Sequence, residues 1–134
     1  MPEENVEVVR RIIREINRGD FDSATNLATV DCELDFSNSR GPESGVYRGR
    51  DQTRQFFNAF VEAWASLRWE LEEVIELEDD RVLTVSQLQM RGHGSGVDVT
   101  VKGASIWTIR DGKVAAQTLY QSKAEALEAA GLSD

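Results

Sequence analysis

Two long strands are predicted by residues 97–121, which read VDVTVKGASIWTIRDGKVAAQTLYQ. Valines at positions 97, 99 and 101 alternate with polar residues, and this period of two is typical of a strand with one face against a core. Asp111-Gly112 is a strong signal for a two-residue hairpin. We therefore predict one strand that runs through Trp107 to Ile109 and a second over Val114–Gln121.

Two further strands precede this hairpin. The stretch Arg81–Arg91 reads RVLTVSQLQMR and predicts another long strand, with a turn after it at His93-Gly94-Ser95-Gly96. An earlier strand begins near residue 68 with Trp69 and Leu71, and it turns at Asp79-Asp80. Strands joined by short turns form an antiparallel meander, which disfavours the strand–helix alternation of a Rossmann fold.

Helices are predicted before the meander. Apolar residues at helical spacing over Val6–Ile16 predict the first helix, and Asp20 suits the cap of a second over Phe21–Ala28. A third helix opens at Asp51. Its wide apolar face comprises Phe56, Phe57, Phe60, Val61, Trp64 and Leu67.

Shorter segments complete the pattern. We expect a strand over Cys32–Ser37, an irregular loop over Ser37–Arg50, and a closing helix over Ala124–Ala130 capped by Ser122. Helices grouped before a meander indicate an α+β fold, with helices on one face of a curved antiparallel sheet.

Length and charge limit the possible functions. The chain has 134 residues, which fits a single domain over 1–134, and 24 acidic against 15 basic residues give a net charge of −9. This balance disfavours binding to nucleic acid or to an anionic membrane. One cysteine, Cys32, excludes an internal disulfide and fits a reducing compartment, so we expect a cytoplasmic protein. One histidine and one cysteine exclude a zinc site made only of those residues, and we expect neither metal nor cofactor.

Five stretches carry a resemblance to a known family: Asn17–Asp20 (NRGD), Tyr47–Arg50 (YRGR), Arg91–Gly96 (RGHGSG), Trp107–Val114 (WTIRDGKV) and Glu125–Leu132 (EALEAAGL). Through them the chain resembles the SnoaL-like domains of the nuclear transport factor 2-like superfamily, which includes ketosteroid isomerases and polyketide cyclases. The resemblance implies a cone-shaped curved antiparallel sheet wrapped around three N-terminal helices. It also implies a largely apolar pocket at the mouth of the cone and a homodimer formed through the outer sheet face.

The catalytic positions of that superfamily carry other residues here. The isomerase base falls on Phe36, with Asp35 one residue away, and the isomerase oxyanion-hole positions fall on Ile12 and Ser105. The aspartate of SnoaL-type cyclases falls on Gln121, which cannot take up a proton at neutral pH. The Asp-Arg-Asp set of limonene epoxide hydrolase is not visible. The resemblance therefore implies the pocket more strongly than the reactions.

Several residues have two interpretations each. Gln117 and Gln121 either orient a ligand inside the cone or satisfy buried backbone groups, whereas Gln87 either joins them or lies on a solvated sheet face. Tyr47 either holds its hydroxyl at the entrance or anchors the loop. His93 is either a rim acid–base group or a surface residue of the turn. The candidate ligand-binding residues are Ile12, Ile16, Phe36, Tyr47, Phe60, Trp64, Gln87, Ser105, Trp107, Gln117 and Gln121.

Three hypotheses follow for function. The first is a protein that binds a small hydrophobic, partly oxygenated molecule in the cone. The second is an acid–base enzyme of isomerase, polyketide cyclase or epoxide hydrolase type that uses Asp35 or His93. A carboxylate in an apolar pocket can have a raised pKa suited to this role. The third is a non-catalytic dimerisation module, which a filled cone would favour.

Overall fold

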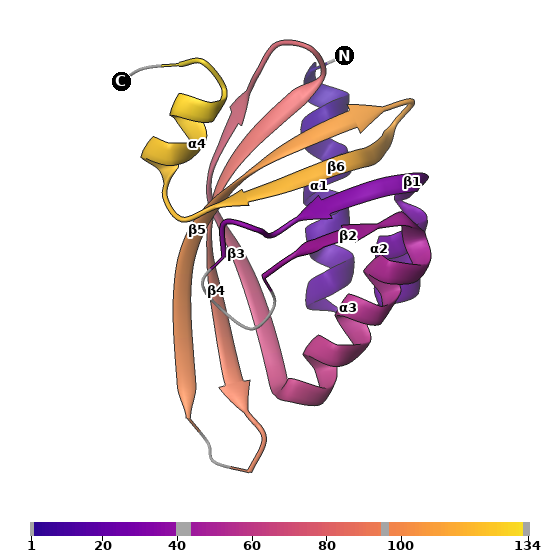
Figure 1. Cartoon of the computed structure of the whole chain (residues 1–134), viewed down its shortest axis with the longest axis vertical. Helices are drawn as coiled ribbons and strands as arrows, with labels where there is room; N and C mark the ends of the chain where they lie inside the picture. The colour runs from indigo at the N-terminus through magenta and orange to yellow at the C-terminus, as the bar shows by residue number, and fades with distance from the viewer. Residues whose placement is uncertain (1, 40–43, 95–96, 133–134) are drawn as a thin grey trace.

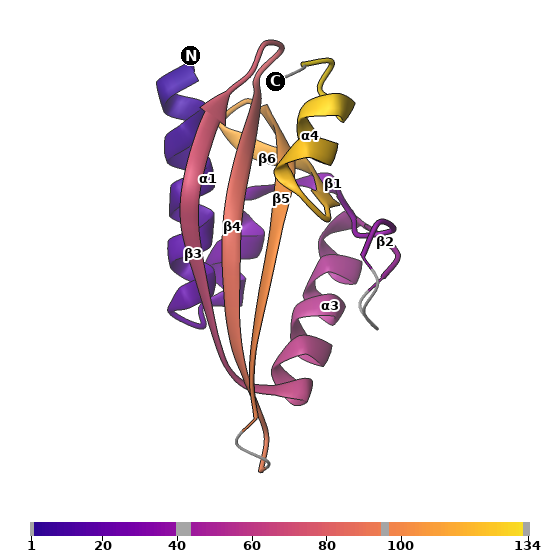
Figure 2. The same cartoon turned by 90° about the vertical axis from the view of Figure 1, so that its left-hand side faces the viewer.

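A computed structural model describes residues 2–39, 44–94 and 97–132 of the protein. Its helices are α1 (Pro2–Asn17), α2 (Phe21–Asn26), α3 (Gly49–Ala63) and α4 (Lys123–Ala129). Its strands are β1 (Ala28–Asp35), β2 (Val46–Arg48), β3 (Trp64–Glu76), β4 (Arg81–Gly92), β5 (Asp98–Arg110) and β6 (Lys113–Tyr120). The strands form one curved sheet that holds α1, α2 and α3 against its concave side, with α4 on the other side (Figure 1, Figure 2). The predicted α+β fold is confirmed.

The sheet is open and mixed rather than antiparallel throughout. The strand order is β2-β1-β6-β5-β4-β3, and β3 to β6 pair antiparallel in chain order, as the meander predicts. β1 instead joins β6 in parallel, with Leu34 beside Gln117. The antiparallel prediction therefore needs correction at β1, because side-chain alternation within a strand does not specify the direction of a distant partner.

Tight turns connect the meander where the sequence predicts them. Asp79 and Asp80 have φ angles of 61° and 57°, and Asp111 and Gly112 have φ angles of 53° and 76°. Two consecutive positive φ angles match the right-handed twist of the strands that such a turn joins. The third predicted turn, His93–Gly96, lies partly outside the described residues.

The third helix ends earlier than its apolar pattern suggests. α3 stops at Ala63, so Trp64 and Leu67 belong to β3 and not to a helix face. Trp64 follows Phe60 at a helical spacing of four, but its backbone is extended and pairs with Gly92 of β4. The pairing of two long strands thus overrides the local helical pattern.

The segment predicted as the loop Ser37–Arg50 contains regular structure at its end. β2 pairs with β1 there, with Tyr47 beside Leu34, and α3 follows at once from Gly49. Gly49 has a φ angle of 80°, which a residue with a side chain rarely adopts. The preceding strand, β1, also starts and ends earlier than the predicted Cys32–Ser37.

Both predicted helix caps are formed. The Asp20 carboxylate accepts a hydrogen bond from the Ser23 backbone N–H at 3.0 Å, and the Ser122 hydroxyl accepts one from the Glu125 N–H at 3.2 Å. These bonds satisfy amides that the first turn of a helix leaves without partners. The bonds from Ser23 to Asp20 also hold the pKa of Asp20 below its ordinary value.

Two apolar clusters lie on opposite faces of the sheet. The first joins the buried stripe of α1 to the concave face at Val82 and Trp107. The second lies under α4, where Leu83 and Ile106 meet Ala126. Adjacent residues of β4 and β5 therefore point to opposite faces. The first cluster packs α1 against one part of the concave face, and the remaining part encloses a cavity.

Candidate functional site

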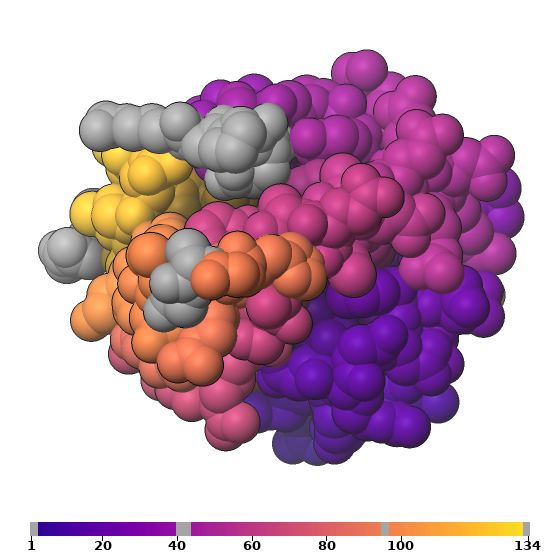
Figure 3. All heavy atoms as spheres, turned by 90° about the horizontal axis from the view of Figure 1, so that it is seen from below, coloured from indigo at the N-terminus to yellow at the C-terminus, as the bar shows by residue number. Residues whose placement is uncertain are grey.

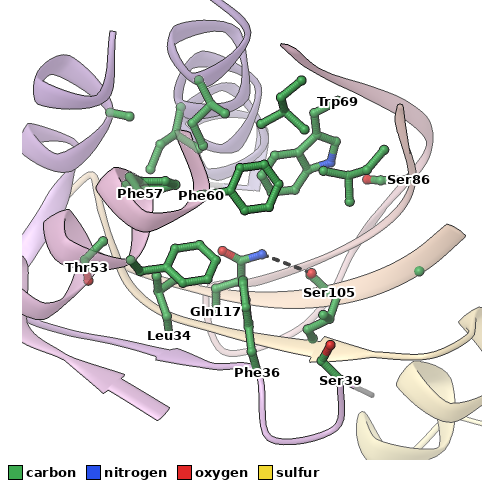
Figure 4. Close-up of a pocket in the computed structure, with 18 of the residues that line it drawn as sticks. Leu34, Phe36, Ser39, Thr53, Phe57, Phe60, Trp69, Ser86, Ser105 and Gln117 are labelled. Carbon is green, nitrogen blue, oxygen red and sulfur yellow. Dashed lines mark hydrogen bonds between the residues drawn. The ribbon is translucent and has the colours of Figure 1, made fainter. Parts of the chain in front are cut away.

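The cone encloses a cavity of about 380 Å³. Its walls come from α1, α2 and α3, from the concave face of β3 to β6, and from β1 with the segment that follows it. Figure 4 shows Phe60 and Trp69 on one side of the cavity and Phe36 and Gln117 on the other. A cavity of this size suits a small organic molecule.

Aromatic side chains form much of the wall. Phe56 meets Phe36 edge to face at 5.2 Å and also contacts Phe60 at 6.1 Å between ring centroids. Trp69 and Trp107 lie in tilted contact at 5.7 Å. Rings packed at these distances lose freedom when the protein folds, so the wall is held in shape before a ligand enters.

Buried polar side chains interrupt the apolar wall. Gln117 and Ser105 are 5% and 3% exposed, and the Gln117 amide nitrogen donates to the Ser105 hydroxyl oxygen at 3.1 Å. The Trp107 indole N–H donates to the hydroxyl of Thr84 at 2.9 Å. Among the described residues, Trp69 Nε1 and Ser86 Oγ are buried on the wall without any hydrogen-bond partner.

Hydrogen bonds hold together the segments around the cavity. Figure 3, which views the molecule from below, shows the lower ends of β4 and β5 beside α3 and the start of β3. The Gln121 amide donates to the Asn38 backbone carbonyl at 2.6 Å, and the Asn38 amide donates to the Leu119 carbonyl at 3.1 Å. On the opposite side, His93 Nε2 donates to the Val61 carbonyl at 3.1 Å. The two bonds of Asn38 connect the segment after β1 to β6 and Gln121, and the single bond of His93 connects the end of β4 to α3.

Most candidate ligand-binding residues lie on the cavity wall. These are Ile12, Ile16, Phe36, Phe60, Trp64, Ser105, Trp107, Gln117 and Gln121. Tyr47, which belongs to β2, is not on the wall, and its ring packs against Phe36 and Phe56. Gln87 is also absent from the wall, since its neighbours Ser86 and Leu88 face the cavity and Gln87 therefore faces outward.

Neither candidate acid–base residue lines the cavity. Asp35 lies between Leu34 and Phe36, which face inward, and its carboxylate accepts hydrogen bonds from the Ser37 N–H and hydroxyl at 3.0 and 2.6 Å. Burial and, after it, the charge of Asp35 raise the pKa of Tyr120, which packs against the cluster under α4 and also contributes to the cavity wall. His93 is exposed on the rim.

Few ionisable groups belong to the wall. Glu33 and Lys102 contribute to it but alternate with inward residues on their strands, and the Glu33 carboxylate pairs with Arg48 at 3.4 Å. Cys32 is buried and lies 3.6 Å from the Thr53 hydroxyl. No three His, Cys, Asp or Glu side chains of the described chain converge as metal ligands would. None of the described helices has the length and apolar character needed to cross a membrane.

Sequence reasoning missed Trp69 and Ser86 as site residues. The sequence pattern places Trp69 only in a strand, and Ser86 lies on the face of β4 opposite to the candidate residue Gln87. A signal existed for Ser86, because Leu88 and Met90 share its face at a period of two. That face has as much apolar character as the other one, so the pattern alone did not select it.

The fold is that of nuclear transport factor 2-like proteins. The family model described as the SnoaL-like domain matches residues 9–117, and the chain therefore belongs to the SnoaL-like domain family. The resemblance inferred from the sequence is confirmed. No curated protein sequence matches the chain significantly.

Solved structures share this fold at low sequence identity. A putative SnoaL-like polyketide cyclase from Jannaschia sp. CCS1 is 24% identical, with a TM-score of 0.75 over 96% of this chain and 92% of that one. SalBIII, an epoxide hydrolase/cyclase-like enzyme, is 20% identical, with a TM-score of 0.77 over 88% and 90%. TerC, co-crystallised with polyporic acid, is 18% identical, with a TM-score of 0.77 over 96% and 98%. Likeness at this level establishes a common fold.

Proposed function

We propose that this protein binds a small, largely apolar, partly oxygenated molecule inside the cone. The observation that carries the proposal is the cavity of about 380 Å³, whose wall is aromatic and aliphatic with a few buried amide, hydroxyl and indole groups. An apolar ligand gains from burial there, and the few polar groups can fix its orientation. The cocrystal of TerC with polyporic acid supports a small organic molecule as the class of ligand.

Binding is favoured over acid–base catalysis because of where the ionisable groups lie. Asp35 is on the outer face and His93 is on the rim, so neither is placed to exchange a proton with a molecule deep in the cone. Gln121, at the position that the cyclase resemblance assigns to a base, is an amide bonded to Asn38. The alternative is an enzyme that uses Asp35 or His93. The fold that this chain shares with the putative polyketide cyclase and with SalBIII supports that alternative.

Two adjacent residues of β4 provide a matched test. Leu88 lines the cavity, whereas Gln87 faces away from it. We expect 1-tetralone and its hydrocarbon analogue tetralin to give saturable NMR shifts at wall residues of the native protein. Leu88→Trp fills the cavity and should abolish these shifts, whereas Gln87→Trp adds the same ring outside and should preserve them. Failure of both probes to bind the native protein would contradict the proposal.

Association through the outer sheet face is a separate proposal. The exposed part of that face carries Gln87, Gln89 and the Arg91–Asp98 ion pair, so a homodimer formed there would have a polar interface. Sedimentation equilibrium would measure it. If the ligand affinity is the same at protein concentrations that give the dimer and at those that give the monomer, ligand binding does not depend on association. The open cavity favours binding over a role in dimerisation alone.

A further inference from the structure

Two indole rings in contact on the cavity wall differ in one respect. The N–H of Trp107 donates to Thr84, whereas the N–H of Trp69 is buried and has no partner among the described residues. The hydroxyl of Ser86, two residues after Thr84 on the same face of β4, also has no partner, and Ser86 is only 5% exposed. A buried polar group without a partner costs folding free energy, so two together on one cavity wall call for an explanation.

The strand register brings these two groups together. Trp69 pairs with Leu88 and Leu71 pairs with Ser86, so Trp69 and Ser86 are diagonal neighbours on the concave face. Diagonal positions of this kind are roughly 7–8 Å apart, which a tryptophan side chain spans easily. Figure 4 shows both side chains on the same part of the wall.

The strand neighbours of Ser86 offer its buried hydroxyl no hydrogen-bonding side chain. On β3 its partner is Leu71, and on β5 its partner is Gly103. Leucine has no hydrogen-bonding group, and glycine has no side chain that could bond the hydroxyl. Thr84, by contrast, is next to Trp107 and completes a hydrogen bond with it. The protein thus satisfies the N–H of Trp107 itself and leaves the N–H of Trp69 without a partner among the described residues.

We propose that Trp69 Nε1 and Ser86 Oγ together bind a carbonyl oxygen of the molecule held in the cone. This inference rests on the proposed ligand-binding function and specifies one chemical feature of the ligand. A carbonyl oxygen has two lone pairs and can accept from the indole N–H and from the hydroxyl at the same time. An alcohol fits less well, because the ligand hydroxyl and the Ser86 hydroxyl can form only one hydrogen bond with each other, so one of their two protons is left without an acceptor.

Three probes on one carbon frame test the proposal: 1-tetralone, 1-tetralol and tetralin. We expect 1-tetralone to bind native protein about tenfold more tightly than tetralin, with 1-tetralol between them. In ¹⁵N-labelled protein, 1-tetralone should move the Trp69 indole proton downfield and leave that of Trp107 in place. The Trp69 resonance is assigned from its loss in Trp69→Phe.

A pair of variants on β4 separates a ligand contact from a structural one. Ser86→Ala should reduce the affinity for 1-tetralone several-fold and leave that for tetralin unchanged. It should not lower Tm, since the hydroxyl has no partner to lose. Thr84→Val should lower Tm, because it leaves the Trp107 N–H unpaired, yet retain the preference for the ketone.

Two results would overturn the inference, and they are distinguishable. If tetralin and 1-tetralone bind equally and the Trp69 proton does not move, the cavity binds ligands without a carbonyl site, and only the inference fails. If neither probe binds native protein, the proposed function fails and the inference fails with it. Because the Trp69 resonance is followed in native protein, poor folding of Ser86→Ala or Thr84→Val does not prevent a decision.

Discussion

Gln117 of β6 and Ser105 of β5 form a hydrogen bond inside the cone, with the amide nitrogen 3.1 Å from the hydroxyl oxygen. The two residues are not directly opposite one another, since Gln117 pairs with Trp107 and Ser105 pairs with Leu119. The bond is therefore diagonal across the strand pair, and it fixes which way the Gln117 amide faces. A polar group of known orientation on an apolar wall is a feature on which ligand selectivity can depend.

Replacing Gln117 tests this bond. Gln117→Leu keeps a similar volume but removes the donor to Ser105, and we expect it to lower the free energy of unfolding by about 1–2 kcal/mol. Urea denaturation provides the measurement. Thr118→Val, on the next residue and the opposite face of β6, is the control and should change stability little. If Gln117→Leu and Thr118→Val lower the free energy of unfolding equally, the buried hydrogen bond does not contribute to stability.

A carboxylate at position 121 tests the environment of the cyclase-type position. In Gln121→Asp the new group would lie on the cavity wall near the Asn38 carbonyl oxygen, and both desolvation and that oxygen disfavour its charged form. We expect the pKa of the new carboxyl to lie above the ordinary value of about 3.9.

The sign of the pH effect follows from that raised pKa. The folded state of Gln121→Asp binds its proton more tightly than the unfolded state, so stability relative to the native protein falls as pH rises through the two pKa values. A ¹³C NMR titration measures the pKa directly. Gln87→Asp, on the outer face of β4, is the control with an ordinary pKa. Identical titration of the two carboxyls would place residue 121 in a solvent-like environment.

The cap of α2 predicts an opposite pH dependence. Bonds from the Ser23 N–H and hydroxyl lower the pKa of Asp20, so the stability that they provide is present above the unfolded pKa and is lost as pH falls through the folded one. Asp20→Ala should lower Tm by a few degrees near pH 7, on the order expected for a lost cap, and by less at pH 2.

The amide variant of the cap separates shape from charge. Asp20→Asn keeps an oxygen that can accept from Ser23, so it should recover much of the stability at pH 7 without the acid-dependent loss. Thermal unfolding followed by circular dichroism at several pH values measures all three proteins. If the difference in Tm between native protein and Asp20→Ala is the same at every pH, the charge of Asp20 does not contribute to the cap.

His93 at the mouth gives a kinetic prediction. Its bond to the Val61 carbonyl joins the end of β4 to α3, and both groups are exposed, so we expect His93→Ala to change stability little. Amide exchange at Gly92 should become faster, and a bound probe such as 1-tetralone should leave more quickly. His93→Gln retains a donor and serves as the control. Unchanged exchange in His93→Ala would mean that this bond does not hold the mouth.

Local signals in the sequence predicted the parts of the fold that depend on neighbouring residues. The Asp111-Gly112 turn needs two residues with positive φ angles, and the Asp20 cap needs an acceptor three residues before an amide. The same information is insufficient at Trp64, where the helical spacing from Phe60 competes with pairing to Gly92. That competition is decided by a strand almost thirty residues away, whose position the local pattern does not contain.

The predicted wall residues on β5 and β6, and Trp64 of β3, do line the cavity, whereas Trp69 of β3 and Ser86 of β4 were not predicted. Ser105 lies on β5 and Gln117 on β6, and the hairpin between these strands fixes their register. Side-chain alternation along the two strands then predicts that both residues face the same side of the sheet. On β4 both faces mix apolar and polar residues, because one lines the cavity and the other packs in part under α4. Only the position of α4 explains why Leu83 is buried behind the sheet while Ser86 faces the cavity.

The parallel pairing of β1 with β6 has a consequence for the order in which the protein forms during synthesis. β1 leaves the ribosome well before its partner, because Leu34 pairs with Gln117, which lies more than eighty residues further along the sequence. The apolar faces of α1 and α3 must therefore wait for a late segment before the cone can close around them. Until then the nascent chain exposes the surfaces that later enclose the ligand. Chaperone protection during translation should matter more for this chain than for one whose neighbouring strands are all consecutive.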